Sequence, residues 1–284
     1  DKPFFAGICF GMPHFPLLAP DEYLKMYDPE DVPLSENVPK EIEQEAREFL
    51  AKYYGLVSMV DVEVGNILQG LEERNILENT VIIFVSDHGE MGGEHGVYNK
   101  LIIQDASMHV PFIIRYPGQF DTAKIKSIVD PSVDIFPTIL DLCDIDIPEY
   151  ADGISLLEQC EQKENALSRD YVYFENIRQP FEEPGYFSKA ARGIRTNDYC
   201  YLEEEGEVVE LYDLRKDKTE QNNLVNSEEY KEVVNRMHKL LQDEMEKYND
   251  SWDLQYPHGL DDFQTDSDAV GWGMKLYNDA VYDD

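Results

Sequence analysis

The residue types best suited to chemistry are concentrated in one short stretch, SDHGEMGGEHGVYNK, at residues 86–100. This stretch contains an aspartate, two histidines, two glutamates, a lysine and four glycines. Carboxylate oxygens and imidazole nitrogens are common ligands of divalent cations, and a lysine ammonium can hold an oxyanion as a point charge. The stretch directly follows VIIFV, residues 81–85, an apolar run typical of a buried strand. The pattern predicts metal or anion chemistry where a strand ends.

Asp87 and His88 are the candidate metal ligands in this stretch, and Lys100 is the candidate anion contact. The glycines among them permit tight backbone paths close to a ligand. Other interpretations stay open at this point, because an Asp-His pair after a strand is also typical of a capped turn. His95 fits either a hydrogen bond that braces the loop or a contact in the site. Glu90 and Glu94 are expected to be solvated or structural.

The surrounding periodicity predicts how these residues are positioned. Residues 3–10 (PFFAGICF) indicate a buried strand, residues 40–75 a long amphipathic helix, and residues 81–85 a second strand. Such a βαβ unit makes its strands parallel, and ligands of a parallel sheet bind beyond the carboxyl ends of its strands. We therefore expect His14, which follows the first strand, to converge with the other three residues, within about 12 Å of Lys100.

The rest of the chain divides into recognisable segments. A third apolar run covers residues 109–117, and residues 134–145 have the pattern of a short helix. Four short strands are expected at 171–176, 191–196, 199–204 and 208–214, and turn formers separate the last three as in an antiparallel meander. A helix over residues 228–248 is expected to follow. The predicted organisation is an α/β domain over 1–160, a smaller antiparallel sheet with a helix over 161–250, and an acidic irregular tail over 251–284.

The composition excludes several classes of function. The 284 residues carry a formal net charge of −35, which argues against binding to nucleic acid or anionic lipid because both favour a basic face. Apolar runs all fall well short of the roughly 20 residues needed to span a bilayer. The four cysteines are far apart and form no C-x-x-C pair, so a structural zinc site is not expected.

Seven segments in a fixed order carry a resemblance to a known family. PHFP, the 81–100 stretch, HVPFIIRYPG, VDIFPTILDL, DGISL, RGIRTNDYCYL and ELYDLRKDKTEQNNL occur in this order. The chain resembles the type I sulfatases, relatives of alkaline phosphatase, over roughly residues 3–225, and it is most similar to the iduronate-sulfatase type. The implied fold is alkaline-phosphatase-like: a mainly parallel sheet with flanking helices, in part, plus a smaller C-terminal antiparallel sheet with a helix.

The resemblance implies a role for each candidate residue. Asp87 and His88 would be ligands of a calcium ion, or of magnesium. His14 and Lys100 would act in catalysis and contact the sulfate together with His95, with Lys100 also neutralising the leaving side. Two departures, His109 in place of an arginine and Lys218 in place of a proline, lie outside this chemistry.

The family's nucleophile is a formylglycine made from a C/S-x-P-x-R segment, and this pattern does not occur in the 284 residues. We therefore expect a C-terminal portion of a sulfatase, inactive alone, that supplies half of a site for a sulfated small molecule or glycan. Its partner would be the N-terminal half of the same protein or a dimer partner. Two alternatives stay open: a phosphonate or phosphate ester hydrolase of the same superfamily, and a binding protein without catalysis. The sequence also leaves the compartment open between the periplasm or exterior and the cytoplasm.

Overall fold

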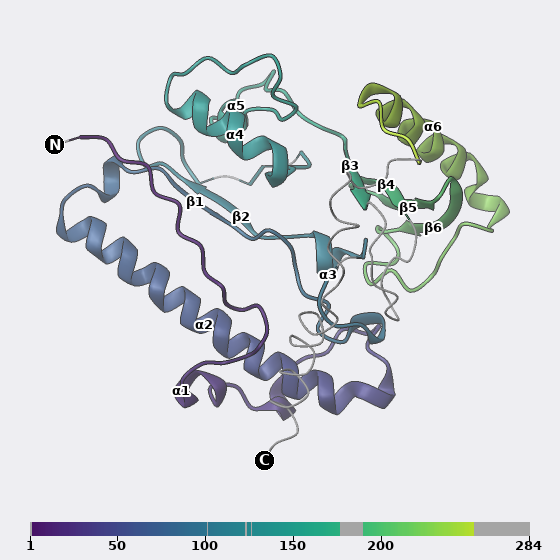
Figure 1. Cartoon of the computed structure of the whole chain (residues 1–284), viewed down its shortest axis with the longest axis horizontal. Coiled ribbons are helices and arrows are strands. Elements are labelled where there is room, and N and C mark those ends of the chain that lie inside the picture. Colours follow the sequence, from purple (N-terminus) through teal and green to yellow (C-terminus); the bar gives the residue numbers. More distant parts are fainter. Residues whose placement is uncertain (1, 101, 123, 126, 177–189, 253–284) are drawn as a thin grey trace, which may run out of the picture. The chain divides into compact units, whose positions relative to one another are not determined.

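A computed structural model describes residues 2–252, except 101, 123, 126 and 177–189. The chain divides into two compact units, one up to Leu77 and one from Glu78 onward, and each is described by itself. The α-helices and β-strands are labelled in Figure 1. Those of the first unit are α1 (Asp21–Leu24), the 3₁₀ turns η1 (Pro29–Asp31) and η2 (Lys40–Ile42), and α2 (Glu43–Glu73). Those that follow are η3 (Leu77–Asn79), β1 (Ile82–Val85), η4 (Glu94–Gly96), α3 (Asp105–Met108), β2 (Phe112–Arg115), α4 (Pro131–Leu142), α5 (Leu157–Cys160), β3 (Tyr171–Asn176), β4 (Ala191–Thr196), β5 (Tyr199–Glu204), β6 (Glu207–Asp213), η5 (Glu228–Tyr230) and α6 (Lys231–Lys247).

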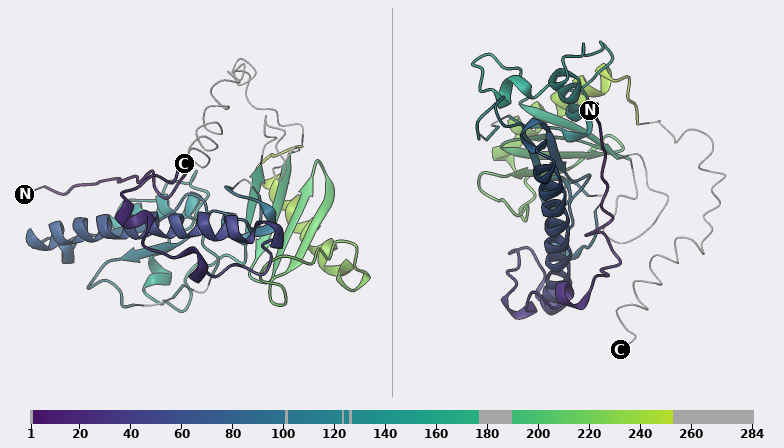
Figure 2. Two further views of the ribbon diagram at one scale, coloured as in Figure 1. Left: turned by 90° about the horizontal axis from the view of Figure 1, so that it is seen from below. Right: turned by 90° about the vertical axis from the view of Figure 1, so that its left-hand side faces the viewer.

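The first unit is built on the long helix α2, which occupies most of the span predicted as helical. Its buried residues include Phe49, Leu56 and Val60, which recur at helical spacing and form one apolar stripe. The short helix α1 packs against α2 (Figure 2). The two backbones approach closely at Gly55, where an added Cβ would lie 2.1 Å from the carbonyl oxygen of Tyr23.

The predicted parallel βαβ unit is not confirmed. Residues 2–10 form no strand, and Phe4, Phe5 and Ile8 are 60%, 81% and 57% exposed. Within the described residues β1 pairs with β2, and the pair is antiparallel, with Phe84 opposite Ile113. The apolar runs predicted burial in a sheet, but an extended segment becomes a strand only where a neighbour exchanges backbone hydrogen bonds with it. Hydrophobicity alone does not report the direction of that neighbour.

The predicted antiparallel meander is present, in the order β3-β4-β5-β6. Alternate residues of the central strand β5 face two different cores, as the period of two requires. Tyr199 and Tyr201 pack with Met237 and Leu241 of α6, which covers one face of the sheet (Figure 1). On the other face, the core consists of Ile103, Ala191, Cys200, Leu202, Tyr212 and Leu214. Ile103 comes from the segment that follows the 86–100 stretch, so this stretch is tied directly to the C-terminal sheet.

A buried ion pair anchors α4 within the second unit. The Asp134 carboxylate is fully buried and accepts two hydrogen bonds from the Arg169 guanidinium, at 2.6 and 2.9 Å. It also accepts the backbone N–H groups of Asp130 and Ile154, at 2.8 and 2.9 Å. All the lone pairs of this buried charge are therefore occupied. Throughout the described ranges, no helix is both long enough and apolar enough to cross a membrane.

Candidate functional site

The 86–100 stretch is a loop that leaves β1, and its first residues are ordered locally. The Ser86 hydroxyl donates to the His88 carbonyl oxygen at 2.7 Å, and the His88 backbone N–H donates to Oδ1 of Asp87 at 3.0 Å. These bonds turn the chain sharply and leave the Asp87 side chain 86% exposed. The capped turn that the sequence left open is therefore present. It presents a carboxylate to solvent at the end of a strand.

Glu90 shapes the remainder of the loop. One oxygen of its carboxylate accepts the backbone N–H groups of Gly92, at 3.1 Å, and Asn99, at 2.6 Å. The Met91 N–H donates to the Asn99 carbonyl at 2.8 Å, which closes the loop on itself. Gly93, which lies between Met91 and Asn99 in the sequence, has φ 96°, a conformation that favours glycine. Glu90 thus has the structural role that was one of its two expected roles, and it sets the position of the chain next to Lys100.

Asp87 and His88 present their two donor atoms together. Oδ2 of Asp87 lies 3.6 Å from Nε2 of His88. Two neighbouring ligands of one calcium ion, each at 2.3–2.6 Å and at right angles, are about 3.3–3.7 Å apart. Partial burial acts to raise the pKa of Asp87, but the His88 charge and its backbone N–H outweigh it and lower that pKa. The pair therefore fits two positions of a divalent cation, and Asp87 is ionised as a carboxylate ligand requires.

Lys100 lies within electrostatic range of this pair. Burial lowers the pKa of the Lys100 ammonium, and the negative charges of Glu90 and Asp87 oppose that effect. Partial removal of water around a cation strengthens its attraction for an anion that replaces the water. Lys100 is thus placed where it could hold an anion beside the Asp87–His88 pair.

The other two candidate residues are placed differently. His95 lies in the same loop with φ 54°, and its buried Nε2 has no hydrogen-bond partner among the described residues. His14 belongs to the first unit, where its ring stacks on Phe15 at 4.5 Å and Nδ1 lies 2.7 Å from the Phe15 carbonyl oxygen. The convergence of His14 with the loop therefore stays a prediction.

The part of the chain that the structure describes contains no group of three or more His, Cys, Asp or Glu side chains able to hold a metal ion. Calcium takes six to eight ligands, so Asp87 and His88 would supply a minority of them.

Sequence reasoning missed the residues that pack against the backbone of this loop. Gly89 N–H donates to the Ser107 carbonyl at 2.7 Å, and Ala106 leaves no space for a side chain at residue 89. No local sequence signal marks Ala106 or Ser107 for this role.

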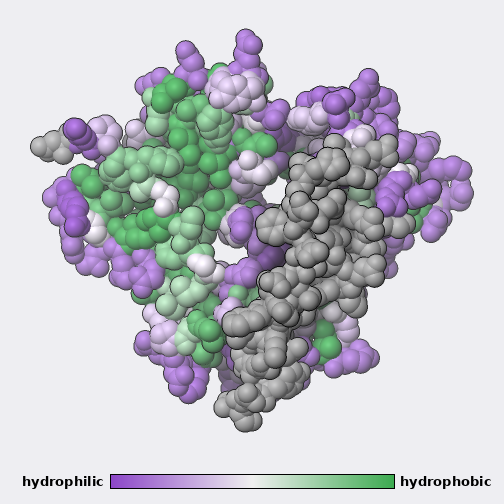
Figure 3. Space-filling model, viewed as in Figure 1, coloured by the Kyte–Doolittle hydropathy of each residue, from purple (hydrophilic) through white to green (hydrophobic). Residues whose placement is uncertain are grey.

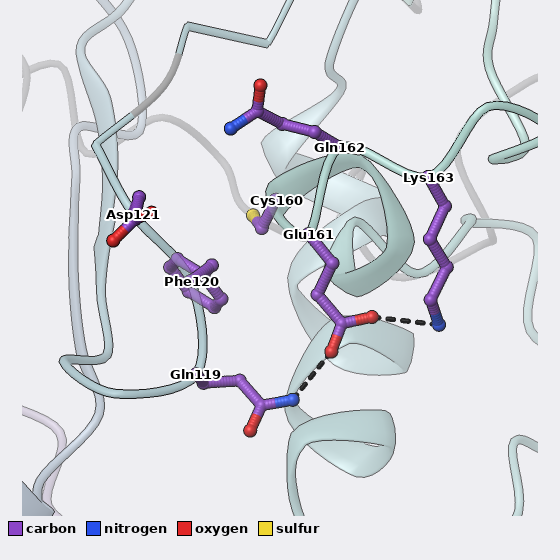
Figure 4. A pocket seen from close by; sticks show the side chains of 7 residues that line it. All are labelled: Gln119, Phe120, Asp121, Cys160, Glu161, Gln162 and Lys163. Carbon is purple, nitrogen blue, oxygen red and sulfur yellow. Dashed lines mark hydrogen bonds and ion pairs between the residues drawn. The ribbon is translucent and has the colours of Figure 1, made fainter.

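A hollow of about 390 Å³ lies elsewhere in the second unit, where residues 119–121 face the end of α5 (Figure 4). Its Glu161 carboxylate is occupied by Lys163, at 2.8 Å, and by the Gln119 amide, at 2.6 Å. Burial raises the pKa of the Cys160 thiol in its wall. A thiol with a raised pKa supplies little thiolate, so Cys160 is a poor candidate for a nucleophile.

Comparison with known proteins decides the family. The sequence model of the sulfatases matches residues 1–145, and that of the C-terminal part of N-sulphoglucosamine sulphohydrolase matches residues 93–247. The chain belongs to the sulfatase family. An arylsulfatase of Clostridium perfringens is 34% identical over 267 residues, which cover 86% of this chain and 54% of that protein. An ulvan-active sulfatase of Formosa agariphila is 33% identical, covering 89% of this chain and 50% of that protein.

Solved structures agree with this sulfatase assignment and with an alkaline-phosphatase-like fold. The phosphonate monoester hydrolase of Agrobacterium radiobacter matches with a TM-score of 0.77 and 27% identity, over 87% of this chain and 57% of that one. The protein BT4656, solved with its substrate D-glucosamine-2-N,6-O-disulfate, matches with a TM-score of 0.65 and 28% identity, over 78% and 45%. The chain spans about half the length of the curated relatives it matches.

Proposed function

We propose that this chain is part of a sulfuric ester hydrolase and supplies half of its metal and sulfate site. The observation that carries the proposal is the exposed Asp87 carboxylate, 3.6 Å from the His88 imidazole and within electrostatic range of Lys100. Asp87 and His88 would hold a calcium or magnesium ion, which supplies positive charge to polarise a sulfate oxygen when bound. The remaining ligands and the formylglycine nucleophile would come from outside these 284 residues.

The roles of this chain's own residues follow from their charge and position. Lys100 would bind a sulfate oxygen and stabilise the negative charge that grows on the leaving oxygen. His14 and His95 would hydrogen-bond the sulfate and orient it. Glu90 would keep Lys100 in place through its two bonds to the loop backbone. A sulfated small molecule or glycan is the substrate class that such a site recognises, and the sulfated glucosamine bound by BT4656 supports that class.

The test uses the complete sulfatase that contains this chain. Removing one charge that stabilises the transition state costs about 10²–10³-fold in kcat. We expect Lys100→Ala to reduce hydrolysis of 4-nitrophenyl sulfate by that factor, and Lys163→Ala, in the hollow near α5, to change it less than about twofold. The loss should appear mainly in kcat. Wild-type turnover by the Lys100→Ala variant would refute the assigned role.

The second candidate function is hydrolysis of a phosphonate or phosphate ester, which the match to the Agrobacterium hydrolase favours. Both reactions require a tetrahedral anion to be neutralised, so the site residues described do not separate them. Rates on 4-nitrophenyl sulfate and on a phenylphosphonate ester, measured on the same preparation, would do so. Faster turnover of the sulfate is expected.

A further inference from the structure

The segment between β2 and the loop of residues 86–100, called the metal loop below, is fixed to the C-terminal sheet. The side chain of Ile103 is 2% exposed and packs in the core formed by β4, β5 and β6. The buried Gln104 amide donates to Glu210 of β6, at 3.3 Å. Both contacts join residues about one hundred positions apart in sequence. They bring the start of α3 against the sheet.

Asp105, the first residue of α3, is held through both its side chain and its backbone. Its carboxylate receives two parallel hydrogen bonds from Arg195 of β4, from Nε at 3.0 Å and from Nη2 at 2.9 Å. Its backbone N–H donates to the carboxylate of Glu220 at 2.8 Å. A fork of this kind fixes orientation as well as distance. A helix of one turn, such as α3, is not stable by itself, so these bonds determine where it lies.

The metal loop rests directly on α3. The Gly89 N–H donates to the carbonyl of Ser107, at 2.7 Å, and a Cβ at residue 89 would lie 2.0 Å from the carbonyl oxygen of Ala106. Gly89 is the neighbour of His88 in sequence. A displacement of α3 would therefore shift the His88 peptide, since no space separates the two backbones.

We propose that Arg195 and Asp105 are positioning residues that hold His88, through α3 and Gly89, in register with Asp87 for metal binding. The inference rests on the proposed function, because it takes Asp87 and His88 as the metal pair. The Arg195 guanidinium binds the Asp105 carboxylate through two parallel hydrogen bonds, and its loss would leave that carboxylate without this partner and release the start of α3.

The first measurement is hydrogen–deuterium exchange on the 284-residue chain, which needs no metal. We expect Arg195→Gln and Asp105→Asn to accelerate exchange of the Gly89 amide at least tenfold. The matched control is Arg215→Gln, which removes another arginine–aspartate fork, with Asp213, at the end of β6. It should leave residues 86–100 at the wild-type rate. Unchanged exchange in α6 shows that each variant is folded, and Asp105→Asn replaces Arg195→Gln if the latter unfolds.

The second measurement is the calcium dependence of hydrolysis by the complete sulfatase. Removing a group that orients a metal ligand typically weakens metal affinity about 10–100-fold. We expect Arg195→Gln to raise the half-saturating calcium concentration by that factor while kcat at saturating calcium stays within about threefold. Arg195→Lys, which keeps the charge without the fork, should recover part of the affinity.

Two results would overturn the inference. One is faster exchange at residues 103–108 with no change at 86–100, which would make the fork a local brace of α3 alone. The other is an unchanged calcium requirement in Arg195→Gln. A wild-type protein that needs no divalent metal would instead refute the proposed function. The exchange result would stand in that case.

Discussion

At the scale of single residues, Glu220 has the most unusual environment among the residues that hold α3 against the C-terminal sheet. Its side chain is 3% exposed, and one carboxylate oxygen has no hydrogen-bond partner among the described residues. Burial raises the pKa of Glu220 to about 8, against an ordinary value of 4.5. The charges of Asp105 and Glu210 add to that rise, while the Asp105 N–H and Arg195 oppose it. Glu220 is therefore protonated at neutral pH in the folded protein.

This environment predicts a pH dependence of stability. Between pH 4.5 and about 8 the folded state keeps the Glu220 proton and the unfolded state loses it, so the free energy of unfolding falls as pH rises through this window. Glu220→Gln, which stays neutral, should match the wild type near pH 5 and exceed it by about 2–5 kcal/mol at pH 9, at about 1.4 kcal/mol per pKa unit. Urea denaturation of both proteins across this range is the measurement. Parallel stability curves would contradict it.

The candidate site residues could be predicted from the sequence. The residues that fix the position of the loop around them could not. Asp87, His88 and Lys100 are recognisable because their types and spacing lie within one stretch. The roles of Asp105 and Arg195 depend on a contact across 90 residues, for which no local pattern exists. Glu90 was expected to be solvated or structural, and only its bonds to Gly92 and Asn99 decide between the two.

At the scale of elements, the meander was predictable to within about a residue because alternating apolar residues and turn formers bound each strand. The pairing of β1 was not predictable. Its residues are a short continuous apolar run, and such a run indicates burial without indicating which strand lies beside it. The long helix α2 was predictable from its period, but its close contact with α1 was not.

The close contact between α1 and α2 lets two glycine-to-alanine substitutions in α2 be compared, one at the contact and one away from it. Alanine is favoured over glycine inside a helix by about 0.5–1 kcal/mol, and an added Cβ at Gly65 meets nothing within 4 Å. Gly65→Ala should therefore stabilise the protein by that amount. At Gly55 the same Cβ would lie 2.1 Å from Tyr23, so Gly55→Ala should destabilise it by about 1–3 kcal/mol. Denaturation followed by circular dichroism measures both, and equal shifts would mean that α1 does not restrict α2.

At the scale of the whole molecule, the described residues leave apolar sheet surface exposed. Phe84 on β1 and Ile113 on β2 face each other across the strand pair and are 37% and 58% exposed. Phe136 on α4 is 46% exposed. Hydrophobic surface is visible over part of the molecule in Figure 3. Exposed sheet surface of this kind favours pairing with another chain or segment. The chain spans about half the length of the sulfatases it matches.

The last prediction follows from what these 284 residues contain. They offer Asp87 and His88 toward a metal that takes six to eight ligands, so calorimetry on the isolated chain should show calcium binding weaker than micromolar.

The 284 residues also contain no C/S-x-P-x-R segment. Removal of a catalytic nucleophile costs on the order of 10⁶ in kcat in a serine protease. We expect no detectable hydrolysis of 4-nitrophenyl sulfate by the isolated chain.

Activity should appear when the chain is mixed with the separately expressed, formylglycine-modified N-terminal segment of its parent protein. The same mixture with an unmodified segment is the control, since it restores the sheet and the metal ligands without the nucleophile. Metal-dependent turnover by the isolated chain would contradict the prediction. It would place a nucleophile among these 284 residues. Cys160 and Cys200 would be poor candidates, because burial raises the pKa of both thiols.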